Sequence, residues 1–324
     1  MSPPRVVVSR PFPGRALEAA HGRLDLWVGP AEGTPREILL ERLAGAEGLV
    51  CTLDDRVDEE LLARAPALRI VATPTAGFEH IDLSAARARG LWVCHAPDAT
   101  TEATADLTLA LLLAAARRLV EADRFVREGR FRGWSPDLFL GLELSGATLG
   151  VVGAGKIGRA VLRRARAFGM RLLYERLGGP DEALEQELGA SFRPLGALLE
   201  ESDAVSLHVP LTAATRHLID ERALARMRPG AILVNAARGP IVDEAALARA
   251  LDQGRLRAAL DVYEREPEVQ PGLRSSDRAV LSPHLGSATV SSREAMMATA
   301  LSAVVAVLLD GRPPRHALVT PSGR

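Results

Sequence analysis

A glycine-rich segment between two apolar runs limits most strongly what this chain can fold into. Thr148–Val152 has the composition of a buried strand, and Lys156–Phe168 has the pattern of a helix. Between them, Gly153, Gly155 and Gly158 form the spacing G-x-G-x-x-G. The first glycine permits a tight turn, the second lets a ligand approach the backbone, and the third allows close packing of helix on strand. The segment therefore predicts a binding site for the pyrophosphate of a dinucleotide.

The same segment partly matches a second phosphate-binding motif, G-x-x-x-x-G-K-[ST]. Gly150 and Lys156 fit it, but the next residue is Ile157, which has no hydroxyl to bind Mg²⁺, so a nucleoside triphosphatase is disfavoured. At the end of the next strand, Glu175 is placed to accept hydrogen bonds from the adenosine ribose, which favours NAD. The adjacent Arg176 is either a guanidinium that holds the 2′-phosphate of NADP or a solvated surface arginine.

Short apolar runs alternate with helix-like stretches along most of the chain, and this rhythm predicts parallel sheets covered by helices. We therefore expect an α/β fold with two doubly wound parallel-sheet domains. The predicted domains are residues 1–97 with 287–324, and residues 98–286, the latter a Rossmann-type cofactor domain. One long helix is expected over residues 103–128. The last helix, residues 289–309, is expected to return to the first domain with the tail that follows it.

Charge and composition exclude several classes of function. The 40 Lys and Arg residues nearly balance 41 Asp and Glu, which argues against a nucleic-acid or anionic-membrane partner. Lys156 is the only lysine, so Schiff-base chemistry would have to use it. Cys51 and Cys94 lie among apolar residues and are expected to be buried thiols. The longest apolar helical stretch is expected at Leu107–Ala116, which is shorter than the about 20 residues of a membrane span. The first ten residues do not resemble a signal peptide. A cytoplasmic protein is expected.

Three segments in the second half carry ionisable side chains directly after apolar strands. They contain Arg238, Glu266 and His284, and each is expected at the carboxyl edge of a sheet, where ligands bind. Singly, each residue is explained as well by a structural salt bridge or a loop. Together they supply what reduction of a 2-keto acid needs: a guanidinium that grips a carboxylate and polarises a carbonyl, an imidazolium that gives a proton, and a carboxylate that keeps the imidazole charged.

The sequence resembles the D-isomer-specific 2-hydroxyacid dehydrogenases along nearly its whole length, and most closely their glyoxylate/hydroxypyruvate reductase branch. The stretches that carry this resemblance are residues 75–82, 103–107, 153–158, 208–212, 228–230, 235–239, 261–267 and 283–286. The resemblance implies NAD(P)H-dependent reduction of a small 2-keto acid to the D-2-hydroxy acid, with no metal. It also implies a flavodoxin-like substrate domain over residues 1–97 and 287–324, and a homodimer built by the long helix and the following loop, residues 133–136, which contains Trp134.

The resemblance further implies roles for single residues. Arg238 binds and polarises the substrate, Glu266 pairs with His284, and His284 is the acid–base; Glu266 is chosen over Glu264 because it directly precedes a proline. Substrate is expected to contact Arg238, His284 and the backbone N–H groups of Ala76 and Gly77. The implied cofactor-binding residues are Gly153, Gly155, Lys156, Ile157, Gly158, Glu175, Arg176, His208, Val209, Pro210, Ala236, Ala237, Asp261 and Gly286.

Two alternatives stay open. The chain is either a reductase of glyoxylate or hydroxypyruvate or one for another 2-keto acid such as 2-ketogluconate, since pocket shape depends on loop packing. It is otherwise a dinucleotide-sensing binding protein with vestigial catalysis, because the related C-terminal binding proteins keep the same three residues. Formate dehydrogenases carry Gln where Glu266 stands, and phosphite dehydrogenases carry Lys where Ala76 stands, so both are disfavoured.

Overall fold

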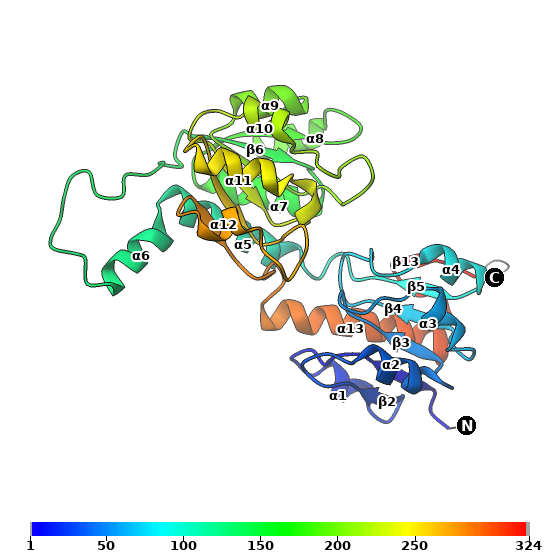
Figure 1. Ribbon diagram of the computed structural model, residues 1–324. Coiled ribbons are helices and arrows are strands. Elements are labelled where there is room, and N and C mark those ends of the chain that lie inside the picture. Colours follow the sequence, from blue (N-terminus) through cyan, green and yellow to red (C-terminus); the bar gives the residue numbers. More distant parts are fainter. Residues whose placement is uncertain (1, 322–324) are drawn as a thin grey trace. The chain divides into compact units, whose positions relative to one another are not determined.

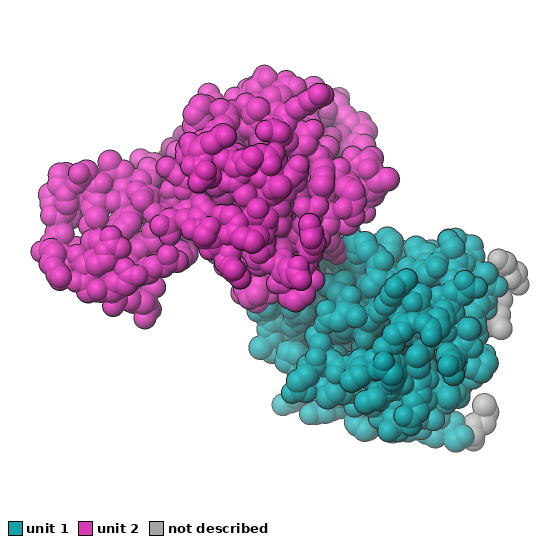
Figure 2. All heavy atoms as spheres, viewed as in Figure 1, with its two compact units in different colours: residues 1–100, 287–324 teal, residues 101–286 magenta. Residues whose placement is uncertain are grey.

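The computed structural model describes residues 2–321, which fold into two compact units (Figure 2). Unit 1 comprises residues 1–100 and 287–324, and unit 2 comprises residues 101–286. The boundary predicted at residue 97 falls at Thr100, because helix α5 begins at the next residue. Each unit is built on its own sheet, and both sheets are covered by helices (Figure 1).

The sheet of unit 2 has seven strands in the order β12-β11-β10-β9-β6-β7-β8, and every neighbouring pair is parallel. The strand order reverses between β6 and β9, and ligands of open α/β sheets bind at such a reversal. The strands are β6 (Thr148–Val152), β7 (Arg171–Glu175), β8 (Ser191–Phe192), β9 (Ala204–Leu207), β10 (Ile232–Asn235), β11 (Arg257–Leu260) and β12 (Ala279–Leu281).

Helices cover both faces of this sheet. One buried core contains residues of α5, α7 and α8, and the other contains residues of α9, α10 and α11. Buried residues on both faces of the central strands β6 and β9 explain why these strands read as continuous apolar runs. The helices are α5 (Thr101–Ala116), α6 (Leu119–Arg127), α7 (Lys156–Ala167), α8 (Glu182–Leu188), α9 (Leu195–Glu201), α10 (Glu221–Arg226), α11 (Glu244–Asp252) and α12 (Pro271–Ser275), with a 3₁₀ turn, η1 (Gly239–Ile241).

The sheet of unit 1 has the order β13-β5-β4-β3-β1-β2. Its first five strands in the chain are parallel and have the flavodoxin-like order, as predicted. Its elements are β1 (Arg5–Val8), α1 (Ala16–Ala20), β2 (Asp25–Val28), α2 (Arg36–Leu43), β3 (Gly48–Val50), α3 (Glu59–Ala63), β4 (Ile70–Ala72), α4 (Leu83–Ala88), β5 (Trp92–Cys94), α13 (Val290–Leu308) and β13 (Ala317–Val319).

The C-terminal segment returns to unit 1, as expected, but it also adds a strand. The side chains of α13 share a core with β1, β3, β4 and β5, and β13 pairs with β5 in antiparallel orientation, so this sheet is not wholly parallel. Helix α13 also corrects the expectation that Leu107–Ala116 is the longest apolar helical stretch. Its 19 residues would suffice for a membrane span by length and composition, although half of the stretch is buried inside the protein.

The single helix predicted over residues 103–128 is wrong, because the chain breaks it after Ala116. Arg118 adopts a left-handed conformation with φ of 53°, and α6 starts at the following residue. The backbone N–H of Leu142 donates to the Ala116 carbonyl over 2.8 Å, a carbonyl that the next helical turn would otherwise use. Residues 117–142, which we call the arm, leave the body of unit 2 between these two points (Figure 2).

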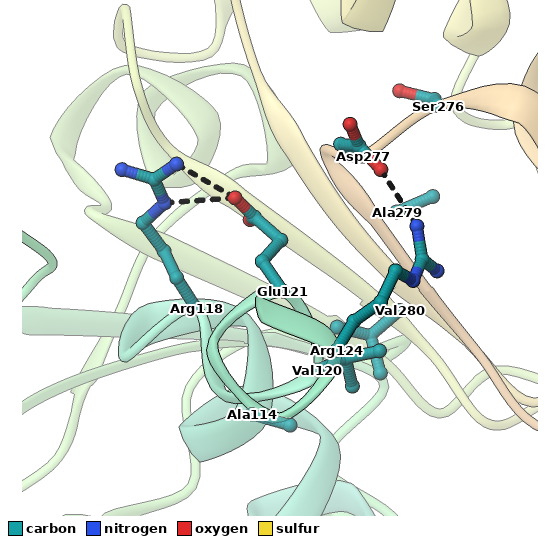
Figure 3. A pocket seen from close by; sticks show the side chains of 9 residues that line it. All are labelled: Ala114, Arg118, Val120, Glu121, Arg124, Ser276, Asp277, Ala279 and Val280. Carbon is teal, nitrogen blue, oxygen red and sulfur yellow. Dashed lines mark hydrogen bonds and ion pairs between the residues drawn. The ribbon is translucent and has the colours of Figure 1, made fainter. Parts of the chain in front are cut away.

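Ion pairs attach the base of the arm to unit 2. The guanidinium of Arg118 donates to Glu121 over 2.6 Å, and Arg257 of β11 donates to the same carboxylate. Burial raises the pKa of Glu121, but these two arginines outweigh it and hold the pKa below its usual value. Arg124 reaches Asp277, just before β12, over 3.1 Å (Figure 3). Arg257 and Asp277 lie far from the arm in sequence, so local pattern alone could not predict the break.

Candidate active site

The glycine turn after β6 has the shape that a pyrophosphate needs. Gly153 has φ of 94°, and a Cβ there would lie 2.7 Å from the carbonyl carbon of His208. A Cβ on Gly158 would lie 2.3 Å from the Gly153 carbonyl oxygen. In contrast, a Cβ on Gly155 would meet no atom within 4 Å. The turn therefore packs tightly on the protein side and is open above Gly155, where a ligand can approach the backbone.

The N-terminus of α7 lies at this turn. Gly155 is the N-cap and has no side chain that could cap the helix, so the turn places the start of a helix where an anion can bind. The end of β9 brings His208–Pro210 beside Gly153. His208 hydrogen-bonds Ser206 over 2.8 Å, and loss of contact with water lowers the pKa of its ring to about 3, so the ring is neutral. These residues fit a dinucleotide.

Glu175, the last residue of β7, lies against the glycine turn. Its backbone carbonyl accepts the N–H groups of Gly153 over 3.0 Å and Ala154 over 3.1 Å, which places the end of β7 against the glycine turn. Burial raises the pKa of the Glu175 carboxyl. Arg176 does not stand free: its guanidinium forms an ion pair with Asp181. The Arg176 side chain is 35% exposed, so a 2′-phosphate would reach this guanidinium in competition with Asp181.

This geometry predicts the cofactor preference. We expect wild-type protein to prefer NADH and to use NADPH detectably, because Glu175 repels a 2′-phosphate while Arg176 offsets part of that repulsion. Glu175→Ala should shift the ratio of kcat/KM toward NADPH on the order of tenfold. Arg176→Ala should lower NADPH use and leave NADH use nearly unchanged. The measurement is that ratio in all three proteins, and a wild type that strongly prefers NADPH would contradict the role of Glu175.

His284 and Glu266 form a hydrogen-bonded pair. Nδ1 of His284 lies 2.8 Å from Oε2 of Glu266, and both side chains are about one-third exposed, at 34% and 36%. The other carboxylate oxygen of Glu266 accepts the N–H of Tyr263 over 2.9 Å. Burial alone would raise the pKa of Glu266, but His284, the Tyr263 amide and the charge of Arg238 outweigh it and lower this pKa below the usual value. The carboxylate is therefore charged at neutral pH, and the pair leaves Nε2 of His284 for a reacting group.

A buried carboxylate shapes the loop that carries His284. Asp261 is 1% exposed and accepts hydrogen bonds from Ser282 Oγ over 2.5 Å, Leu285 N over 2.7 Å and Gly286 N over 2.8 Å. His284 itself takes a left-handed conformation with φ of 55°, and its N–H donates to the Asp261 carbonyl over 2.8 Å. Asp261 thus holds His284 in a backbone conformation that residues other than glycine rarely adopt. Its role in cofactor binding stays a prediction.

Arg238 is set beside this pair by a turn after β10. The buried side chain of Asn235 donates to the Arg238 carbonyl over 2.9 Å and accepts the Ala237 N–H over 3.1 Å. The next residue, Gly239, is so close to the neighbouring loop that a Cβ would lie 1.9 Å from the Tyr263 carbonyl. Backbone contact therefore joins the loop that carries Arg238 to the loop that carries Glu266, and the predicted triad comes together within unit 2. Ala236 lies in the same turn and is 9% exposed.

Removal of the Glu266 charge should change the pH profile. In Glu266→Gln the amide still accepts a hydrogen bond, but it no longer stabilises an imidazolium. We expect the alkaline limb of keto-acid reduction to move to lower pH than in wild type, because the variant lacks the carboxylate that pairs with His284. Glu268→Gln, which changes an exposed glutamate two residues on, is the matched control. The measurement is the pH profile of the reduction rate in both variants and in wild type. If the alkaline side of the profile did not shift in Glu266→Gln, the electrostatic pairing would be disproved.

The predicted substrate loop lies in unit 1. Gly77 is buried and Ala76 is half-buried, in the loop that follows β4. Thr75 Oγ1 donates to the Gly77 carbonyl over 2.7 Å, and the ring of His95 contacts the Ala76 carbonyl over 2.9 Å. These contacts occupy the carbonyl groups of the loop, and its amide groups remain the part expected to bind a carboxylate.

Sequence reasoning missed a second His–Glu pair in unit 2. His217 Nε2 lies 2.6 Å from Glu264 Oε1, and His217 is also left-handed, with φ of 51°. The amide of Glu264 donates to the buried carboxylate of Glu244 over 2.7 Å, and burial raises the pKa of that carboxyl. No sequence signal joins residues 217 and 264, since their pairing depends on how two loops pack.

Comparison with known proteins shows which family this chain is similar to. Residues 109–286 match the family described as "D-isomer specific 2-hydroxyacid dehydrogenase, NAD binding domain". A glyoxylate reductase of Thermococcus litoralis is 43% identical over 318 residues, which are 96% of each chain. A solved structure of a Thermus thermophilus protein is 46% identical, with a TM-score of 0.92 over 97% of this chain and 100% of that one.

A third relative has a solved structure with a bound cofactor. The NADPH-dependent glyoxylate/hydroxypyruvate reductase of Sinorhizobium meliloti, in complex with NADP and malonate, is 33% identical to this chain. Its TM-score is 0.85, and the match covers 99% of this chain and 97% of that one. The similarity extends over both units, at identities well above those that show only a shared fold. The chain belongs to the D-isomer specific 2-hydroxyacid dehydrogenase family.

Proposed function

We propose that this protein reduces glyoxylate, hydroxypyruvate or a closely similar small 2-keto acid to the D-2-hydroxy acid with NAD(P)H. The observation that carries the proposal is the 2.8 Å pair of His284 and Glu266 at the carboxyl edge of a dinucleotide-binding sheet, with Arg238 close enough to lower the pKa of Glu266. The names of the glyoxylate reductases that match nearly the whole chain support the substrate class.

The side chains divide the work of the reaction. Arg238 grips the substrate carboxylate and polarises the carbonyl. His284 donates the proton from Nε2 to the carbonyl oxygen, while Glu266 holds Nδ1 and stabilises the charged ring. The nicotinamide, when bound, supplies the hydride to the carbonyl carbon. Ala76 and Gly77 are proposed to bind the substrate carboxylate through their amides. Because Arg238 provides the positive charge, this scheme requires no metal.

The experiment that tests the function follows NADH absorbance with a panel of glyoxylate, hydroxypyruvate, pyruvate and 2-ketogluconate. The proposal expects the highest kcat/KM with glyoxylate or hydroxypyruvate. A preference for 2-ketogluconate would move the protein to the alternative reductase class. Binding of NADH with no turnover of any keto acid would instead indicate a dinucleotide-sensing protein, and would refute the proposed activity.

The arm supports a homodimer. No residue of α6 is buried, and apolar side chains project from the arm, with Leu119 60%, Val126 58% and Trp134 84% exposed. Exposed apolar patches of this kind mark interaction surfaces. We propose that a second copy of the chain covers the arm, and that the dimer works in the cytoplasm with no nucleic-acid or membrane partner.

Mass measurement in solution tests the dimer. Wild type should have about twice the chain mass of 34.6 kDa. Val126→Glu combined with Leu119→Glu should yield the single-chain mass, because two buried charges would lack partners in the interface. Leu177→Glu is the control, since Leu177 is 92% exposed but lies outside the arm. Light scattering measures the masses of wild type, the double variant and the Leu177→Glu control. A double variant that stays dimeric would exclude the arm as the interface.

A further inference from the structure

Asp181 joins two arginines at the edge of the glycine turn. It is the N-cap of α8, where Oδ1 accepts the Leu184 N–H over 3.0 Å. Its second oxygen, Oδ2, accepts hydrogen bonds from the guanidinium groups of both Arg159 and Arg176. The Asp181 side chain is only 15% exposed. Its backbone is fixed as well, because the N–H donates to the hydroxyl of Tyr174 over 2.6 Å.

Both arginines lie where the adenosine end of a dinucleotide is expected. Arg159 is in the first turn of α7, and its Nε donates to the Ala154 carbonyl in the glycine turn over 3.3 Å. Arg176 directly follows Glu175, the residue placed to meet the ribose hydroxyls. In folds of this type, an arginine near that acidic residue accommodates the 2′-phosphate of NADP. The two guanidiniums therefore have the chemistry and the place of a phosphate site.

The charges at this edge cancel. Arg159 and Arg176 contribute two positive charges, and Asp181 and Glu175 contribute two negative ones. The Leu184 amide and Arg159 hold the pKa of Asp181 below its usual value, so this carboxylate stays charged at neutral pH. A 2′-phosphate entering the edge would compete with a carboxylate that already has both guanidiniums as partners.

We propose that Asp181 determines cofactor specificity by occupying, as an internal counter-ion, the position that a 2′-phosphate would take between Arg159 and Arg176. NADH has no such phosphate and binds without disturbing the two ion pairs, whereas NADPH must break them. The inference rests on the proposed function only in that it requires a dinucleotide at the glycine turn.

The test is Asp181→Asn. Asparagine still caps α8 but does not hold two guanidiniums by charge. Calorimetry should show adenosine 2′,5′-bisphosphate binding about tenfold or more tightly than to wild type, while 5′-AMP and NADH change less than about twofold. The gain should shrink at high salt, because it is electrostatic. Asp181→Ser also caps a helix but is too short to hold the two guanidiniums, so it should show the gain even where the asparagine amide oxygen still binds them.

Two further variants make the outcome specific. Arg159→Ala with Arg176→Ala in the Asp181→Asn background should abolish the gain. Asp220→Asn is the matched control, because Asp220 caps α10 through the Ala223 N–H over 2.8 Å. Unchanged affinity for the bisphosphate in both Asp181 variants, or an equal gain for 5′-AMP, overturns the proposal. Wild-type protein that binds neither NADH nor 5′-AMP would show instead that the nucleotide site itself is wrong.

Discussion

Replacing His284 with alanine should lower keto-acid reduction by about 10²–10⁴-fold, the usual effect of removing a general acid. NADH binding should persist, because the glycine turn and the end of β7 do not depend on this ring. His217→Ala is the matched control: its ring is 40% exposed against 34% for His284, and it also pairs with a glutamate. Stopped-flow single-turnover rates with saturating NADH separate the chemical step from binding. Near-normal reduction by His284→Ala, or an equal loss in His217→Ala, would refute the assignment of the acid.

Replacing Arg238 with lysine should be far from conservative. Lysine keeps the charge but loses the planar two-point grip on a carboxylate, so kcat/KM for the keto acid should fall by about 10²-fold or more. NADH affinity should change little. Arg265→Lys, at an exposed arginine beside Glu266, controls for a general effect of arginine replacement on this loop. Equal losses of cofactor and substrate binding would identify Arg238 as a structural ion-pair residue instead.

Sequence reasoning found the elements that local pattern defines. The glycine turn and the strands that precede Arg238, Glu266 and His284 are visible because a buried parallel strand is a short apolar run with a polar end. The roles of these residues came from resemblance, and they remain to be tested. The last helix was also expected to return to the first domain, and α13 belongs to unit 1.

What sequence reasoning missed depends on partners distant in the chain. The break at Arg118 depends on Leu142 and on an ion pair from β11. Strand β13 is three residues long and gains its partner only where β5 leaves an open edge. Asp181 was overlooked because an acidic residue at a helix start is normally just a cap. Its contacts with two arginines, 5 and 22 residues away, appear only in the folded chain.

Gly239 has a consequence for how this protein would respond to random mutation. A methyl group at this position would overlap the Tyr263 carbonyl and come within 2.4 Å of the Glu264 nitrogen, and those are backbone atoms that cannot rotate away. In a saturation library screened for activity, position 239 should therefore tolerate substitution as poorly as position 238. The pattern of tolerated substitutions would therefore suggest that Gly239 takes part in the chemistry. Gly239 has no side chain, however, and it only allows the two loops to approach each other closely.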